Sequence, residues 1–251
     1  METLVKHLDY ITDIPQTEDI SMVRMHLLQT RGIKPSDKHL LNTYLESKYT
    51  DYLYKNLYVA SIPTELRDVV YCFAQQSGGR TEWNFAWQRY LNANVGTDKS
   101  TLLTALGCTS DHGLLKRYLE KLVVPNCGIR TQDRLQALLA VAQNMHGGYD
   151  IARRFFRQHI LQFHHYCQVQ NGVPRALLHF SRLMYTQEDL KEVDEMVSNN
   201  EVCFGKDSLL AQEARENILS NALWFKEHYY NFLQALVSQT QRNKKDNENC
   251  L

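Results

Sequence analysis

The sequence predicts an all-α protein, folded as an irregular α-solenoid of stacked antiparallel helix pairs of the HEAT or armadillo kind. Three observations support this fold class. Apolar residues recur at the i, i+3, i+4, i+7 spacing of amphipathic helices along nearly the whole chain, whereas no segment alternates as a strand does. Short turns separate the expected helices, which are each roughly 10–15 residues long. The helices pair about every 30–35 residues, a period typical of helical repeats.

The first part of the chain is expected to hold three helices, at residues 1–13, at 19–31 and from Ser36 onward. Gly32 stands where a left-handed cap would end the second helix. The third helix carries its apolar stripe as far as Tyr49.

Residues 65–122 are expected to form four consecutive amphipathic helices. The glycine pair at 78–79 ends the first of them. The second carries Trp83 and Trp87 one turn apart on its apolar stripe, so both rings are predicted to pack in the core rather than to form a ligand cage. Pro125 breaks the run after the fourth helix.

In the rest of the chain Thr186 and Asp189 fit a variant capping box, and Pro174 suits the start of a helix. Residues 199–206 are expected to form a loop. The predicted helices lie at 135–142, 151–160, 174–181 and 190–197, and from 207 to about 237 as one helix or two.

The predicted organisation is one solenoid domain at residues 1–240, followed by a disordered polar tail at 241–251. Lys plus Arg and Asp plus Glu number 28 each, so no basic excess points to nucleic acid. The longest apolar run spans about six residues, far short of the roughly 20 that a membrane-spanning helix needs. The first residues contain no apolar segment of the secretory-signal kind.

The chemistry of known active sites is missing from the sequence. HExxH, the GxSxG elbow, GxxxxGK[ST] and GxGxxG all fail to occur, which argues against a zinc peptidase site, a serine hydrolase site and a phosphate-binding loop. His164 and His165 are adjacent, so on a helix they point about 100° apart and cannot easily share an ion. From its residues alone, the chain is predicted to be a helical domain without catalytic or metal-ligating residues.

Six cysteines are present, and none forms a CxxC pair, which argues against zinc ribbons and thioredoxin-like sites. Their number is compatible with reduced thiols and also with a disulfide, because disulfides follow the compartment rather than the count. The residues themselves leave both alternatives open.

Several short segments recur together in one family, and their order and spacing agree with this chain. The chain resembles the C-terminal helical domain of the aminopeptidase N-like zinc metallopeptidases, from about Ile14 to Val237. The segments that carry the resemblance are DVVYC (68–72), EWNFAW (82–87), ALGCTSD (105–111), LLKRYL (114–119), IRTQD (129–133), CFG (203–205), and ENI (216–218) with Trp224.

The resemblance implies a solenoid that folds over the cleft of a separate catalytic domain, encloses the peptide cavity and can carry homodimer contacts. In the family, zinc and the catalytic Glu belong to HExxH of the catalytic domain, and GxMEN reads the N-terminal amine. Neither sequence occurs here, so this chain is expected to hold no cofactor and to be inactive alone. The implied partners are a peptide substrate and that catalytic domain.

The resemblance also implies site residues. Family members carry a disulfide at the positions of Cys72 and Cys108, whereas the second family disulfide has no cysteines here. Peptide-cavity positions match Phe155 and His159, although the family usually has Asn at the latter. Arg130 is a candidate carboxylate partner, with a structural pair to Asp133 or to a neighbouring carboxylate as the favoured alternative.

Together these observations favour a non-catalytic domain of an aminopeptidase, either as a fragment or as a gene product without its peptidase half. The alternative is a stand-alone solenoid that binds peptides or an aminopeptidase partner. As part of a larger protein it is expected outside the cell, at the plasma-membrane surface or in the ER lumen. Expressed alone without a signal, it is expected in the cytoplasm.

Overall fold

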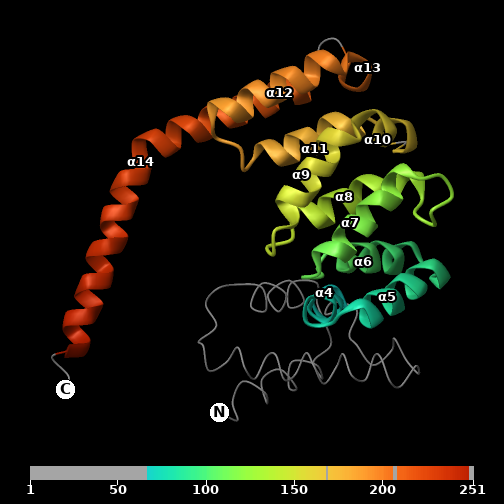
Figure 1. Cartoon of the computed structure of the whole chain (residues 1–251), viewed down its shortest axis with the longest axis horizontal. Coiled ribbons are helices and arrows are strands. Elements are labelled where there is room, and N and C mark those ends of the chain that lie inside the picture. The colour runs from blue at the N-terminus through green and yellow to red at the C-terminus, as the bar shows by residue number, and fades with distance from the viewer. Residues whose placement is uncertain (1–66, 168, 206–207, 249–251) are drawn as a thin grey trace, which may run out of the picture. The chain divides into compact units, whose positions relative to one another are not determined.

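A computed structural model describes residues 67–167, 169–205 and 208–248, with the backbone alone described for residues 230 and 235–248 (Figure 1). Every regular element in these described residues is a helix, which confirms the predicted all-α class. The chain divides within α9 into two compact units, one up to Phe155 and one from Phe156 onward. The helices expected before residue 66 lie outside the described residues.

The described elements follow one another with short connections. They are α4 (Arg67–Ser77), α5 (Arg80–Asn92), α6 (Gly96–Leu106), α7 (His112–Glu120), the 3₁₀ turns η3 (Lys121–Val123) and η4 (Thr131–Asp133), α8 (Arg134–Ala142), α9 (Gly148–Gln158), α10 (Ile160–Tyr166), α11 (Gly172–Ser181), α12 (Gln187–Asn199), α13 (Glu201–Phe204) and α14 (Leu209–Glu248).

In the first unit, alternate helices lie side by side. Helix α4 packs on α6 and α6 packs on α8, while α5 packs on α6 and α7 on α8 (Figure 1). Antiparallel helix pairs that stack on one another produce this pattern. The solenoid architecture itself stays a prediction.

The core of the first unit is built on aromatic side chains. Trp83 is 2% exposed and stacks on Trp87 with 5.8 Å between ring centroids, and Tyr118 meets Trp83 edge-on at 5.9 Å. Two of the buried polar atoms in this cluster bond to helix carbonyls: Trp83 Nε1 donates to Leu106 O at 3.1 Å, and the Tyr118 hydroxyl to Leu103 O at 2.8 Å. The predicted packing role of both tryptophans is therefore confirmed.

The second unit has a separate core. Helix α11 packs on α14, and both α12 and α13 contact their neighbours in the same unit. Phe156 contributes its ring to this core, 6.0 Å from that of Phe163 and 5.4 Å from that of Phe180. All three side chains are buried, so the apolar stripes of α10 and α11 meet around them.

One side chain of α14 closes the end of α11. Asn221 Nδ2 donates to the carbonyls of Ser181, Arg182 and Met184, at 3.4, 3.1 and 2.9 Å. Those carbonyls belong to the end of α11 and the turn after it, where the regular hydrogen bonds of the helix end. This amide therefore helps to fix α14 against α11.

The structure departs from the expected helices at three places. Residues 199–206 were predicted to form a loop, and this is wrong, because α13 forms a helical turn there. The helix expected at 151–160 ends at Gln158, and α10 begins at Ile160 after a break at His159. From residue 209 onward α14 is one helix as far as Glu248. The domain limits at 240 and the disordered tail stay predictions.

Candidate functional site

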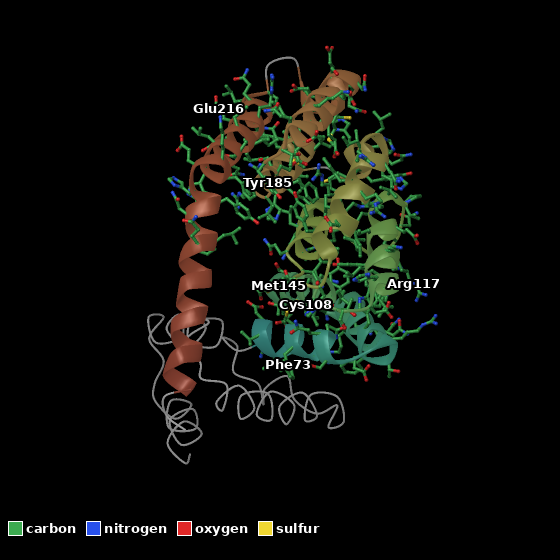
Figure 2. The ribbon with its side chains drawn as sticks, turned by 60° about the vertical axis from the view of Figure 1, so that its left-hand side comes forward. Phe73, Cys108, Arg117, Met145, Tyr185 and Glu216 are labelled. Carbon is green, nitrogen blue, oxygen red and sulfur yellow. A yellow bond between two sulfur atoms is a disulfide. The ribbon has the colours of Figure 1, made fainter. Side chains whose placement is uncertain are left out.

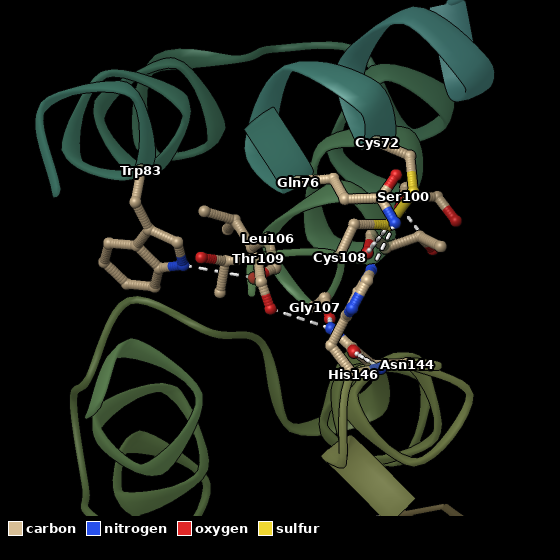
Figure 3. Close-up of a disulfide and its surroundings, with 11 residues drawn as sticks. Cys72, Gln76, Trp83, Ser100, Leu106, Gly107, Cys108, Thr109, Asn144 and His146 are labelled. Carbon is tan, nitrogen blue, oxygen red and sulfur yellow. Dashed lines mark hydrogen bonds between the residues drawn. A yellow bond between two sulfur atoms is a disulfide. The ribbon is translucent and has the colours of Figure 1, made fainter. Parts of the chain in front are cut away.

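A disulfide joins Cys72 of α4 to Cys108, two residues beyond the end of α6 (Figure 3). The two Cα atoms lie 5.2 Å apart across a sequence separation of 36 residues. The side-by-side packing of α4 on α6 brings these positions together. The pairing expected from the family resemblance is confirmed.

Hydrogen bonds tie the next helix to the same place. Asn144, just after α8, donates its Nδ2 to Gly107 O at 2.7 Å and to Thr109 O at 2.8 Å (Figure 3). A Cβ at Gly107 would lie 2.7 Å from the backbone carbon of Ala140, so only glycine allows α6 and α8 to approach this closely. The segment that carries Cys108 is therefore held from two sides.

Two histidines complete this corner. Gln76 and His146 are hydrogen-bonded through their Nε2 atoms, 2.6 Å apart. Since the Gln76 amide nitrogen can only donate, the His146 ring nitrogen accepts. His112 Nε2 donates to His146 O at 2.7 Å, and the Ser110 hydroxyl to Gln76 O at 3.2 Å. Met145, which precedes His146, is 87% exposed. Figure 2 labels the side chains of Met145 and Cys108.

We call this cluster the stapled corner; it comprises Cys72, Gln76, 107–112 and 144–146. It joins α4, the turn after α6 and the α8–α9 connection by one covalent bond and several hydrogen bonds. Its polar groups are engaged with backbone carbonyls and with one another. The arrangement fixes α4 and the C-terminal ends of α6 and α8 relative to one another.

Arg130, predicted as a possible cavity residue, lies in an ion pair within the first unit. Its Nε donates to Asp133 Oδ2 at 2.6 Å, three residues away, and Asp133 is buried. This hydrogen bond raises the pKa of Arg130 above its ordinary value. The geometry matches the structural pair that the sequence offered as the alternative. The Arg130 side chain is still 42% exposed, and contact with a peptide stays a prediction.

Phe155 and His159 were expected four residues apart on one helix. Phe155 lies in α9 and is 8% exposed, which places it in the core. His159 lies between α9 and α10 and is half-buried, at the N-terminus of α10. Helical spacing does not continue through His159. The cavity-lining role of both residues stays a prediction.

Sequence reasoning missed the buried guanidinium of Arg134. This side chain is 2% exposed, and its two terminal nitrogens donate to Leu122 O at 2.5 Å and Val124 O at 3.0 Å. It fixes the connection between α7 and α8. No sequence pattern marks it, because its partners are backbone carbonyls 10 and 12 residues away.

In the described part of the chain, no group of three or more His, Cys, Asp or Glu side chains could hold a metal ion. These residues therefore do not fit the zinc that the family resemblance implies for a catalytic domain. Among the same residues, no helix is both long and apolar enough to cross a membrane.

Comparison with known protein families matches residues 4–220 to the ERAP1-like C-terminal domain. The chain belongs to this family. Both cysteines of the stapled corner lie inside the matched residues. The ERAP1-like C-terminal domain also includes all helices from α4 to α13 and the first part of α14.

Curated relatives of this ERAP1-like C-terminal domain carry aminopeptidase names. Aminopeptidase Ey of Gallus gallus is 29% identical over 171 residues, or 66% of this chain. Aminopeptidase N of Bos taurus is 31% identical over 172 residues, or 68% of the chain. Aminopeptidase N of Homo sapiens is 28% identical over 184 residues, or 72%. The chain spans only 17%, 18% and 19% of the lengths of these three relatives.

Proposed function

We propose that this chain is the non-catalytic C-terminal domain of an aminopeptidase and encloses the cavity that holds the peptide. The family match over residues 4–220 carries this proposal. Relatives with aminopeptidase names support it, since the chain matches less than a fifth of each of those named above. A catalytic domain of the same enzyme is then the main partner, and a peptide is the substrate of the whole.

Zinc in the catalytic domain would supply the water-activating chemistry of peptide hydrolysis. The residues of this chain contribute no ligand to it in the proposal, because neither HExxH nor GxMEN occurs in the sequence. The chain instead forms a rigid wall of the peptide cavity. The stapled corner supports such a role, since it holds the alternate helices α4, α6 and α8 together.

Within this proposal, Arg130 is the best-placed candidate for meeting a peptide carboxylate. Its guanidinium is paired with Asp133 through Nε, which fixes its direction, and the side chain remains 42% exposed. Phe155 and His159 are kept as further cavity candidates on the family resemblance alone. We also propose the family's homodimer contacts for the assembled enzyme.

The Cys72–Cys108 disulfide supports a location outside the cell, at the plasma-membrane surface or in the ER lumen. Disulfides form and persist in oxidising compartments and are rare in the cytosol. The bond therefore supports the proposal of a secreted or membrane-bound aminopeptidase.

Two assays test the proposal. The purified chain, given zinc and an aminoacyl-arylamide, should release no arylamine, and turnover that a chelator abolishes would overturn the non-catalytic assignment. In the second assay, the chain replaces the matching domain of the bovine aminopeptidase N. A chimera that cleaves peptides supports the enclosing role. A chain that binds peptides alone, paired with an inactive but folded chimera, would favour the stand-alone binding module instead.

A further inference from the structure

One side of α14 carries three large apolar side chains that the described fold leaves uncovered. Leu219, Leu223 and Trp224 are 50%, 57% and 56% exposed. They lie close together in the helix, within about 140° of its circumference, so they form one patch. Single exposed leucines are ordinary on a protein surface, whereas a contiguous apolar group that includes a tryptophan is typical of a binding surface.

The opposite side of α14 is the packed one. Ala214 and Ile218 are buried, and Phe225 stacks on Tyr185 with 4.7 Å between ring centroids. At about 100° per residue, Phe225 and Glu216 project from the helix in opposite directions. Figure 2 shows Glu216 on the outer side of α14 and Tyr185 on its inner side. The exposed patch is therefore turned away from the core of the second unit.

Carboxylates frame the patch at both ends. Glu213 and Glu216 precede it and Glu227 follows it, and all three side chains are exposed. Within the described residues none of the three forms an ion pair, whereas the neighbouring Arg215 is paired with a carboxylate of α12 at 2.8 Å. Lys226 adds one exposed positive charge at the edge, so negative charge predominates. We call this surface the acidic face; it comprises Glu213, Glu216, Leu219, Leu223, Trp224 and Glu227.

The charges of the acidic face decide which class of partner fits it. A second copy of the chain would set carboxylates against carboxylates in either orientation, with Glu216 opposite Glu227 in an antiparallel pair and each opposite itself in a parallel one. An anionic lipid surface would also repel these side chains. A positively charged partner gains from the same arrangement, because its cations meet carboxylates that have no ion-pair partner within the described residues.

The backbone of the acidic face favours a helical partner over an extended one. All of its residues lie inside α14, so their N–H and C=O groups are engaged in the hydrogen bonds of that helix. An extended peptide would need an unpaired strand edge, and recognition here must come from side chains instead. The side-chain ridges of one helix fit the grooves of another at an axial distance of about 8–10 Å.

We propose that the acidic face of α14 docks a basic amphipathic helix of a partner protein. The partner helix places apolar side chains on Leu219, Leu223 and Trp224, and lysine or arginine side chains on both sides of them. Glu216 and Glu227 are about three helical turns, or roughly 16 Å, apart, and this distance sets the spacing of the partner's cations. The inference goes beyond the proposed aminopeptidase role and does not depend on it.

Tryptophan fluorescence of the full chain tests this docking. Trp83 and Trp87 are buried whereas Trp224 is exposed, so a blue shift of the emission reports that the acidic face is covered. The probe is a synthetic helix of about five turns, with leucines on one side and lysines about three turns apart around them. A second probe carries glutamate in place of each lysine.

We expect the basic probe to shift the emission and to bind at least tenfold more tightly than the acidic probe, with a smaller difference at high salt. Equal binding of the two probes, or no shift with either, contradicts the proposal. A shift caused by concentrating the chain alone, or by phosphatidylserine vesicles, would assign the face to a second copy or to a membrane and would overturn it.

Variants of exposed residues locate the binding without threatening the fold. Replacing both Glu216 and Glu227 by Gln should weaken binding of the basic probe about tenfold, and Leu223→Ala about fivefold, with unchanged melting temperatures. The matched control replaces Glu188 and Glu201 by Gln, since these exposed glutamates lie on α12 and α13 and carry the same total charge. If the control weakens binding as much as the acidic-face variant, general charge attraction explains the binding and the proposal fails.

Discussion

The side chain of Asn144 connects two turns that lie far apart in the sequence. Its amide nitrogen bonds to two carbonyls of the turn that contains Cys108, while its amide oxygen accepts from the backbone N–H of His146 at 2.7 Å. The carbonyls lie 37 and 35 residues away in sequence. The side chain thus fixes its own turn and a distant one together.

Replacing Asn144 with Ala should lower the free energy of unfolding by about 1–3 kcal/mol, because two carbonyls lose their donor. Gln143→Ala is the matched control, since Gln143 is an exposed neighbour in the same connection. Urea denaturation of both variants measures the difference. A cost no larger than that of Gln143→Ala would show that water replaces the amide without loss.

The buried hydroxyl of Tyr118 makes the stability of the folded chain depend on pH. Burial, together with the nearby Tyr90, Asp133 and Cys127, raises its pKa well above the ordinary 10.0. Above pH 10 the unfolded chain releases this proton while the folded chain retains it, so the contribution is complete below pH 10 and is lost as the pH rises.

We therefore expect the wild-type chain to lose stability as the pH rises above about 10, and Tyr118→Phe to lose less over the same range. Near neutral pH the variant should be about 1 kcal/mol less stable, because the bond to Leu103 O is gone. Tyr185→Phe is the control, as Tyr185 is 44% exposed. Denaturation at a series of pH values gives the result, and identical alkaline slopes would refute it.

For single residues, the sequence predicts which apolar side chains are buried. It does not predict the hydrogen-bond partners of polar side chains. Trp83 and Trp87 follow from their spacing on one stripe. Asn144 and Arg134 cannot be assigned in that way, because their partners are backbone carbonyls brought close only by tertiary packing. The disulfide followed from family resemblance, whereas the cysteine count alone left it open.

At the scale of elements, α12 begins as its sequence indicates. Thr186 caps the helix by accepting from Asp189 N at 3.0 Å, and Asp189 Oδ2 accepts from Thr186 N at 3.0 Å. The predicted capping box is confirmed. It satisfies backbone donors that would otherwise lack partners at the start of the helix.

Thr186→Ala should destabilise the second unit by about 1 kcal/mol, since the cap loses its acceptor. Ser198→Ala at the other end of α12 is the control, because the Ser198 hydroxyl bonds only locally to Glu195 O on an exposed face. Thermal denaturation followed by circular dichroism compares them. Equal melting temperatures would mean that the cap contributes little.

Helix positions were predictable where an apolar stripe and a turn signal agree, as for α4 and its following glycine pair. The prediction failed at His159 and at 201–204. Helix α13 has only four residues, and two of them, Cys203 and Phe204, are buried. So short a helix is stabilised by packing rather than by local helix propensity. The sequence pattern of these residues is therefore typical of a loop.

At the scale of the whole molecule, the disulfide is the strongest constraint on the first unit. It closes a loop that contains the rest of α4, all of α5 and all of α6. The loop-entropy description assigns about 3–4 kcal/mol to a closure of this length. Its contribution acts mainly through the unfolded chain rather than through new native contacts.

A variant with Ser at both Cys72 and Cys108 should therefore lose about 3–4 kcal/mol of unfolding free energy. Cys127→Ser, which leaves the bond intact, serves as the control and should stay within about 0.5 kcal/mol of the wild type. Guanidinium denaturation under non-reducing conditions measures both. If the double variant is as stable as the control, the bond is not formed in the folded protein.

The same bond changes how the chain would carry a mechanical load. Tension applied to the two ends of the molecule passes directly between Cys72 and Cys108, so the segment between them bears no force even after every helix has come apart. At the extended length of a polypeptide this shelters about 12 nm of contour. A single-molecule pulling trace would gain that length only after reduction, and helices α5 and α6 would be the last to be straightened.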